Sequence, residues 1–214
     1  MIKFMTLFFI LFFSACSFNA PQNIWQRKSA NAFSSYTKNF LANNNGMATN
    51  DLQRAIKHAK QSANLTQLAR VYLGKCALNI SVGREDNCQE YLDIADVVNS
   101  KKLQAYYSFI TKSISDEEIG FLPNYYQEYS KNIKNKNFIE ANKNILTMPR
   151  VTSTLLCGVL IKENLEQTSR EKITQLASFY GYKKAVLFWL NEQKTFTKDI
   201  KKKAYLDKKI FILK

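Results

Sequence analysis

Two cysteines, Cys76 and Cys88, have the spacing in this chain that best suits covalent chemistry. They lie six residues on either side of Val82, which is the centre of a predicted turn between two helices. At 1.5 Å per residue, each cysteine is about 9 Å along its helix from that turn, so an antiparallel hairpin would bring both to the same level. A disulfide needs Cα atoms within about 7 Å, which this arrangement would allow. The alternative is two small buried apolar side chains, because cysteine is among the most buried residue types.

The other residues that could serve as nucleophile, base or metal ligand have no suitable neighbours. His58 is the only histidine, and no carboxylate or second ligand lies near it at helical spacing. A nucleophile–base pair and a zinc-bound water both need such partners. Cys157 lies among leucines and valine, which predicts a buried, inert thiol. The six glycines are scattered singly, so no phosphate-binding loop is predicted. We therefore expect no cofactor, no metal and no enzymatic activity.

Carboxylates occur in three short groups, which leave one enzymatic alternative open. The groups are Glu85-Asp86, Glu90-Asp93-Asp96 and Asp116-Glu117-Glu118. Two paired carboxylates would suit glycoside hydrolysis. We prefer the interpretation that Glu85 and Asp86 open a helix, where negative charge interacts favourably with the helix dipole.

Aromatic residues are more numerous than a small helical core requires. Several occur as adjacent pairs, and two neighbouring side chains on one helix cannot both point inward. One member of each pair is therefore expected to face a groove or solvent. Since tyrosine and tryptophan are enriched at protein interfaces, we predict an interface containing the following residues: Tyr107, Tyr126, Tyr182 and Trp189.

The elements that would position these residues are all helical. Apolar residues recur at helical spacing, only three prolines interrupt the chain, and no stretch alternates convincingly with period two. Helices are predicted over about 24–41, 50–63, 65–81, 84–98, 101–115, 124–134, 136–148, 150–165, 169–180 and 182–193. The Asn43–Gly46 segment is expected to end the first helix, and Thr49 or Asn50 to cap the second. The predicted fold class is all-α, built from antiparallel hairpins with short connections.

Two segments are similar to helical repeat families. Leu68-Ala69-x-x-Tyr72 and Cys88-x3-Leu92-x2-Ala95 resemble the two helices of a tetratricopeptide repeat, and the segment from Leu176 to Leu190 resembles one ankyrin repeat. The resemblance implies that residues 22–196 form a short tetratricopeptide-like α-solenoid, whose concave surface would suit protein or peptide binding. A compact helical bundle is the alternative.

The N-terminus has the order of features found in export signals. Lys3 precedes an apolar run from Phe4 to Phe13, and small residues follow. The run is shorter than the about 20 residues that a spanning helix needs. Phe13-Ser14-Ala15-Cys16 resembles the lipobox of bacterial lipoproteins. It implies a signal peptide over 1–15, a lipidated (palmitate-bearing) Cys16 and a tether over 16–21.

By the same resemblance, Ser17 favours the outer membrane, with the protein facing the periplasm. The membrane would then be bound through the lipid anchor. An exported compartment also permits oxidation, which favours the disulfide between Cys76 and Cys88.

The chain is strongly basic, with a formal net charge of +14. Abundant Lys, Asn, Ile, Phe and Tyr are also typical of an AT-rich genome, so the charge is partly a codon effect, and with export we expect no nucleic-acid ligand. The basic C-terminal tail, 197–214, follows Lys194 and interleaves lysines with apolar residues. It predicts either an amphipathic helix on an anionic membrane or acidic partner, or a solvated last helix.

Together these features lead us to expect a membrane-anchored, non-enzymatic adaptor that binds a protein partner in a bacterial envelope complex. The alternative is an envelope protein that binds or hydrolyses the cell wall through its carboxylates.

Overall fold

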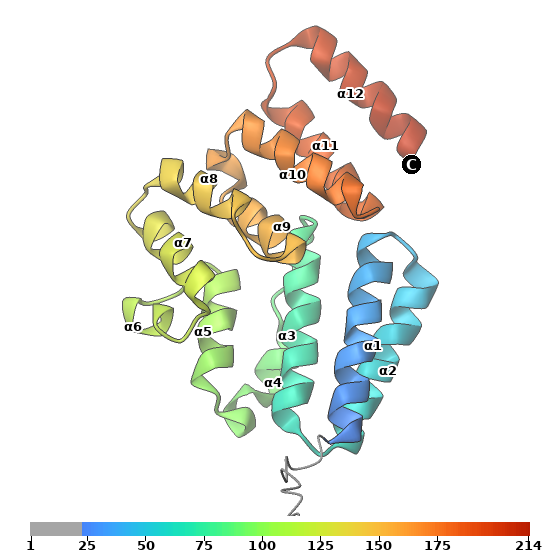
Figure 1. Cartoon of the computed structure of the whole chain (residues 1–214), viewed down its shortest axis with the longest axis vertical. Helices are drawn as coiled ribbons and strands as arrows, with labels where there is room; N and C mark the ends of the chain where they lie inside the picture. The colour runs from blue at the N-terminus through green and yellow to red at the C-terminus, as the bar shows by residue number, and fades with distance from the viewer. Residues whose placement is uncertain (1–22) are drawn as a thin grey trace, which may run out of the picture.

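The computed structural model describes residues 23–214, which form helices and no strands (Figure 1). The predicted all-α class is therefore confirmed for this part of the chain. The helices are α1 Ile24–Leu41, α2 Asn45–Gln61, α3 Leu65–Ser81, α4 Gln89–Val98, α5 Lys101–Ile110, α6 Asp116–Ile119, α7 Asn124–Lys134, α8 Phe138–Leu146, α9 Val151–Leu160, the 3₁₀ helix η1 Lys162–Asn164, α10 Gln167–Phe179, α11 Lys183–Phe196 and α12 Ile200–Leu213. The predicted signal peptide 1–15, the lipidated Cys16 and the tether 16–21 lie outside the described residues.

Helix boundaries agree with the sequence where local capping decides them. Helices α3 and α7 have the predicted bounds, 65–81 and 124–134. The side chain of Asn64 accepts a hydrogen bond from the backbone N–H of Gln67 at 3.0 Å, which caps α3. Pro123 precedes α7 and cannot itself donate a backbone hydrogen bond, so it marks the start of that helix.

The predicted second helix, 50–63, begins too late. Asn43 alone adopts the left-handed conformation, with φ 70°, that closes α1. The chain can restart at once, so Asn45 and Gly46 belong to α2 rather than to a loop.

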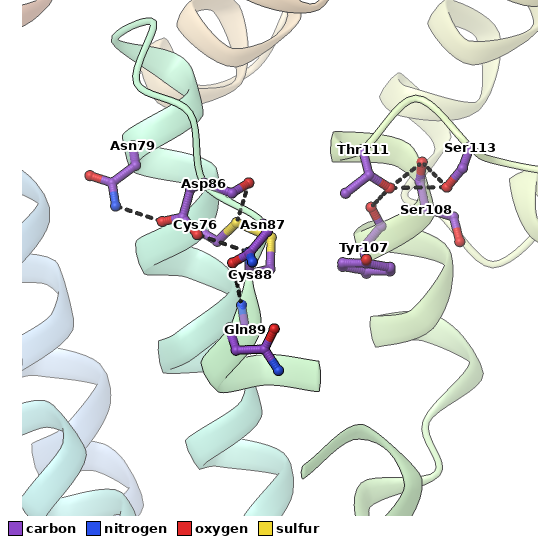
Figure 2. Close-up of a disulfide and its surroundings, with 10 residues drawn as sticks. All are labelled: Cys76, Asn79, Asp86, Asn87, Cys88, Gln89, Tyr107, Ser108, Thr111 and Ser113. Carbon is purple, nitrogen blue, oxygen red and sulfur yellow. Dashed lines mark hydrogen bonds between the residues drawn. A yellow bond between two sulfur atoms is a disulfide. The ribbon is translucent and has the colours of Figure 1, made fainter. Parts of the chain in front are cut away.

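The predicted helices 84–98 and 101–115 are both too long. Helix α4 begins only at Gln89, so Glu85 and Asp86 do not open a helix. Helix α5 ends at Ile110, where the Thr111 hydroxyl donates to the carbonyl of Tyr107 at 2.9 Å and Lys112 has φ 61° (Figure 2). Side-chain hydrogen bonds of this kind offer the backbone an alternative to continuing the helix.

Antiparallel hairpins are the main packing unit, and they include α1–α2, α3–α4, α7–α8 and α10–α11. Helices far apart in sequence also pack, because α3 contacts α9 and α1 contacts α11. In a linear solenoid each repeat contacts only its neighbours. The array is therefore curled, with α3 between the α1–α2 hairpin and the α5–α7 region (Figure 1).

One apolar core runs through most of the described chain. Its largest fully buried side chains include Trp189, Tyr129 and Phe109. The hydroxyl of Tyr129 donates to the carbonyl of Cys157 at 2.6 Å, so this buried polar group is satisfied. Cys157 is a free, fully buried thiol, and burial raises its pKa well above the usual value, as an inert core cysteine requires.

The predicted basic tail, 197–214, is mostly helix α12. It packs on α11 through Leu206 and Ile210, which are both buried. Among residues 23–214, none of the helices is both long and apolar enough to span a bilayer.

Candidate functional site

Cys76 and Cys88 form a disulfide in the structure, with Cα atoms 5.2 Å apart (Figure 2). Cys76 lies in α3, as predicted, but Cys88 is not in a helix. It is the residue before α4 and has a left-handed backbone, with φ 59°. The segment from Val82 to Cys88 runs back along α3, so the two cysteines meet although the helix expected over 84–98 does not begin until Gln89.

The carboxylate of Asp86 holds this returning segment in place. It accepts hydrogen bonds from the Asn79 side-chain amide at 2.7 Å and from the backbone N–H of Cys88 at 2.8 Å. Cys76, Cys88 and Asp86 have donor atoms within 4.8 Å of one another, as a metal site would require. The sulfur atoms are bonded to each other and the carboxylate is hydrogen-bonded, so the arrangement functions as a structural staple.

The four aromatic residues predicted at an interface do not share one surface. Tyr126 and Trp189 are only 5% and 0% exposed, so neither side chain faces open solvent. Tyr125, the neighbour of Tyr126, is exposed, whereas Phe188, the neighbour of Trp189, is half-buried. Tyr107 is half-buried against Tyr91, with ring centroids 5.5 Å apart, and Tyr182 is half-buried beside Tyr180.

Two adjoining hollows lie where α1, α3, α5, α7 and α9 converge. Their volumes are about 400 and 620 Å³. They share four lining residues, Tyr106, Tyr126, Arg150 and Thr152, so they form one continuous tract, which we call the Arg150 groove. Tyr126 contributes to its floor, and Tyr182 lines the smaller hollow.

The Arg150 groove is basic. Its cations are Lys38 in the smaller hollow, Arg70 and Lys102 in the larger, and Arg150 in both. Among the described residues that line the two hollows, none is Asp or Glu, and none of these four cations forms an ion pair within residues 23–214. The groove therefore presents exposed positive charge that an acidic ligand can neutralise.

Aromatic rings and neutral polar groups make up much of the rest of the groove. The hydroxyl of Tyr126 donates to Ser153 at 2.8 Å, and burial raises the pKa values of Tyr106 and Tyr126 well above the usual range. These phenols stay neutral at physiological pH and act as hydrogen-bonding and stacking surfaces. Phe33 approaches α3 closely because Gly74 lies opposite it, where a Cβ atom would be 2.5 Å from the ring.

The carboxylate groups proposed for wall hydrolysis lie on different elements, and each group has at least one member held by an ion pair or hydrogen bond. Glu90 pairs with Lys75, Asp116 pairs with Lys134 at 2.7 Å, and Asp93 accepts from the Gln89 amide. Glu118 belongs to a capping box with Ser115, and hydrogen bonds from the Ser115 backbone and the Ser108 hydroxyl lower its pKa despite partial burial. None of these carboxylates lines either hollow of the Arg150 groove.

His58 has a surface role in the structure. Its ring stacks on Trp25 with centroids 5.6 Å apart, and its Nδ1 atom lies 2.9 Å from the Gln61 side-chain oxygen. Neither neighbour is a nucleophile or a metal ligand.

Sequence reasoning missed Arg70, Arg150 and Thr152. The pattern marked Pro149 only as a break before a helix, and Arg150 is the residue that follows it, at the N-cap of α9. An exposed arginine at a helix start has no distinctive signal of its own. Arg150 becomes part of a candidate site only because α9 packs against α3, which brings Arg150 and Arg70 to the same hollow.

Comparison of the chain with protein-family models, with curated proteins and with solved structures found no match.

Proposed function

We propose that this chain is a lipid-anchored, non-enzymatic adaptor of a bacterial envelope that binds an acidic segment of a protein partner in the Arg150 groove. The lipid anchor and the outer-membrane, periplasm-facing location follow from the lipobox resemblance around Cys16. The observation that supports the binding role is the groove itself, which combines unpaired cations with aromatic walls and lacks carboxylates.

The size and the chemistry of the groove favour an extended protein segment. The two hollows follow one another across several helices, as a binding surface for an extended chain would. Arginine and tyrosine are the residues that most often dominate binding energy in protein interfaces. Guanidinium groups also bind carboxylates with two parallel hydrogen bonds, which would fix the orientation of an acidic segment.

The wall-hydrolase alternative has less support. Glu90, Asp116 and Glu118 are used in ion pairs or a helix cap. A hydrolytic pair would need two carboxylates facing one cleft, about 5 to 10 Å apart.

Site-specific crosslinking in the native envelope tests this function. A photoreactive amino acid at Thr152, in the middle of the groove, should give a discrete protein adduct. The same group at Lys131, an exposed lysine on α7 outside the groove, serves as the control. Equal adducts at both positions, or none at Thr152, would contradict the proposal.

The charges of the groove can be tested on the crosslinked partner. Arg70→Gln and Arg150→Gln together should weaken its binding about tenfold or more, because two charged contacts are lost. Lys131→Gln removes an exposed positive charge that does not line the groove. It should leave the affinity for the partner within about twofold of wild type. If the two variants weaken binding equally, the attraction is general rather than located in the groove.

A further inference from the structure

A second groove, separate from the Arg150 groove, lies between α12 and the α10–α11 hairpin. Its volume is about 750 Å³. Val186, Leu190 and Leu206 line it as buried apolar side chains. Phe179 and Tyr205 also line it, and they are 83% and 63% exposed. We call this the C-terminal groove.

The rim of the C-terminal groove is positively charged. Lys183 and Lys209 line it and form no ion pair within the described chain. Lys202 is neutralised by Glu171, the one acidic residue among the lining side chains. Two lysines therefore remain free to pair with a negatively charged ligand.

Helix α12 is joined to the rest of the fold along one face. Leu206 and Ile210 are buried against the fold, and Lys194 of α11 pairs with Asp207 at 2.5 Å. Near the turn between α10 and α11, Gly181 has no neighbouring atom within 4 Å of an added Cβ, so the groove is open at that end.

We propose that the C-terminal groove binds an acidic amphipathic helix of a protein partner. A helix laid into a groove inserts apolar side chains at positions i, i+3, i+4 and i+7. Here the recessed Val186, Leu190 and Leu206 would receive that apolar face, and Lys183 and Lys209 would pair with Glu or Asp on its flanks. This site goes beyond the proposed function, since it shares no residue with the Arg150 groove.

Two observations favour this occupant over an anionic membrane surface. The apolar floor is recessed, so side chains must reach into it, which a flat bilayer surface cannot do. Helix α12 also lies at the opposite end of the molecule from the start of α1 (Figure 1). If the chain is anchored at its N-terminus, as in the proposed function, the anchoring membrane is nearer the other end.

Two equally exposed phenylalanines provide a matched test. Phe179 lines the groove and is 83% exposed, whereas Phe211 does not line it and is 82% exposed. The probe is a synthetic 18-residue peptide with Leu at helical spacing and Glu at the other positions, titrated into the full chain. Phe179→Ala should weaken its binding about tenfold, as loss of an aromatic anchor does, and Phe211→Ala should change it less than about twofold. Equal losses from the two variants would overturn the proposal.

The rim charges give a second matched pair. Lys183→Glu with Lys209→Glu should weaken binding of the same peptide about tenfold or more, because two attractive contacts become repulsive. Lys203→Glu with Lys208→Glu makes the same change in net charge on residues that do not line the groove, and should have a much smaller effect. Circular dichroism of each variant confirms that the fold is kept.

Competing occupants are separated in the same experiments. Tighter binding to phosphatidylglycerol vesicles than to the peptide, with equal sensitivity to Phe179→Ala and Phe211→Ala, would assign α12 to a membrane and overturn the proposal. Dimerisation of the free chain that Phe179→Ala abolishes would assign the groove to a second copy and overturn it too. Arg70→Gln with Arg150→Gln weakens acidic binding in the Arg150 groove, and in this background Phe179→Ala should still weaken peptide binding about tenfold. Failure here is thereby distinguishable from failure of the Arg150 groove.

Discussion

Lys184 is a buried lysine without a carboxylate partner in the described chain. Its side chain reaches from α11 to the first hairpin, where the ammonium donates to Asn45 Oδ1 at 3.0 Å and lies 3.8 Å from the centre of the Phe40 ring. A cation over an aromatic face is stabilised by the ring quadrupole. Burial, and then the charge of Arg84, lower the pKa of Lys184 to about 8.

This lowered pKa predicts a pH dependence of stability. Below about pH 8, Lys184 is protonated in both states and the folded protein bears the cost of a buried charge. Between about 8 and 10.5, the folded protein loses this proton while the unfolded chain keeps it, so the free energy of unfolding gains a contribution that rises with pH. Urea unfolding at about pH 7 and about pH 9.5 should show this rise as a difference between wild type and Lys184→Met.

The comparison between the two proteins is the informative quantity, because every titratable group other than Lys184 is common to both. Lys172→Met, at an exposed lysine of α10, is the matched control and should follow the wild type at both pH values. Parallel pH profiles for wild type and Lys184→Met would show that the buried ammonium has no effect on stability.

The cysteine pair shows what residue spacing can and cannot predict. Equal distances from Val82 suggested that Cys76 and Cys88 meet, and they are joined in the structure. The reason differs from the prediction, because Asp86 binds Asn79 and the Cys88 backbone and keeps the intervening segment out of a helix. A side chain that bonds to the backbone two residues ahead leaves little trace in an apolar periodicity.

Helix α9 packs unusually close to its neighbours at Gly158. A Cβ atom there would lie 2.8 Å from Trp189 Cζ2 and 2.9 Å from Ile173 Cδ1, both in the core. Gly158→Ala should therefore lower the free energy of unfolding by about 1–3 kcal/mol through overpacking. Gly46→Ala, in α2 with nothing within 4 Å, should instead raise it by up to about 1 kcal/mol through helix propensity.

Thermal or urea unfolding of the two glycine variants measures both effects. The pair is useful because the substitution is chemically identical and only the surroundings differ. If both variants were stabilised, the close approach of α9 to Trp189 would be wrong.

The disulfide fastens the segment after α3 to the start of α4. It closes a loop with a sequence separation of 12. Cys76→Ala with Cys88→Ala should lower the free energy of unfolding by about 2–3 kcal/mol, as expected from the loop-closure entropy of a short loop. Dithiothreitol should destabilise the wild type by a similar amount and leave the double variant unchanged. If dithiothreitol destabilised both proteins equally, the disulfide between Cys76 and Cys88 would not be the source of the effect.

Helix boundaries were predictable where capping residues act alone. Asn64 before α3 and Pro123 before α7 mark those starts, and both helices have the predicted bounds. The C-terminal end of α5 depends on Thr111, and the start of α4 depends on Asp86. The hydrogen bonds of both side chains form only in the folded chain. Composition and periodicity therefore predicted the fold class better than individual helix boundaries.

The Arg150 groove belongs to the whole molecule rather than to any element. Most of its residues come from five helices, and they meet because α3 contacts α9, which lies far along the chain. A hairpin pattern in sequence predicts contacts between neighbours only. Tyr126 was selected from sequence as an interface residue facing a groove or solvent, and it lies in the groove floor, while Arg150 was not selected at all.

Membrane attachment is the prediction that concerns the intact protein. Under the proposed function, Cys16→Ala removes the lipid and should release the protein from the membrane fraction, because the lipid is the proposed anchor. Fractionation of cells expressing each form measures this. Retention of the variant in the membrane would point to another anchor, and deletion of residues 197–214 in that variant would show whether α12 provides it.

The position of Cys157 constrains the order in which this protein can fold and oxidise. Three cysteines of the helical body allow three pairings, and two of them use Cys157. Once α9 is packed, the thiol is shielded and its pKa is raised, so it no longer exchanges with the disulfide. Before that, only the greater entropic cost of the longer loops opposes a wrong pairing. Helix α9 therefore protects the correct bond kinetically, and oxidant that reaches the chain before α9 has packed competes with the folding of that helix.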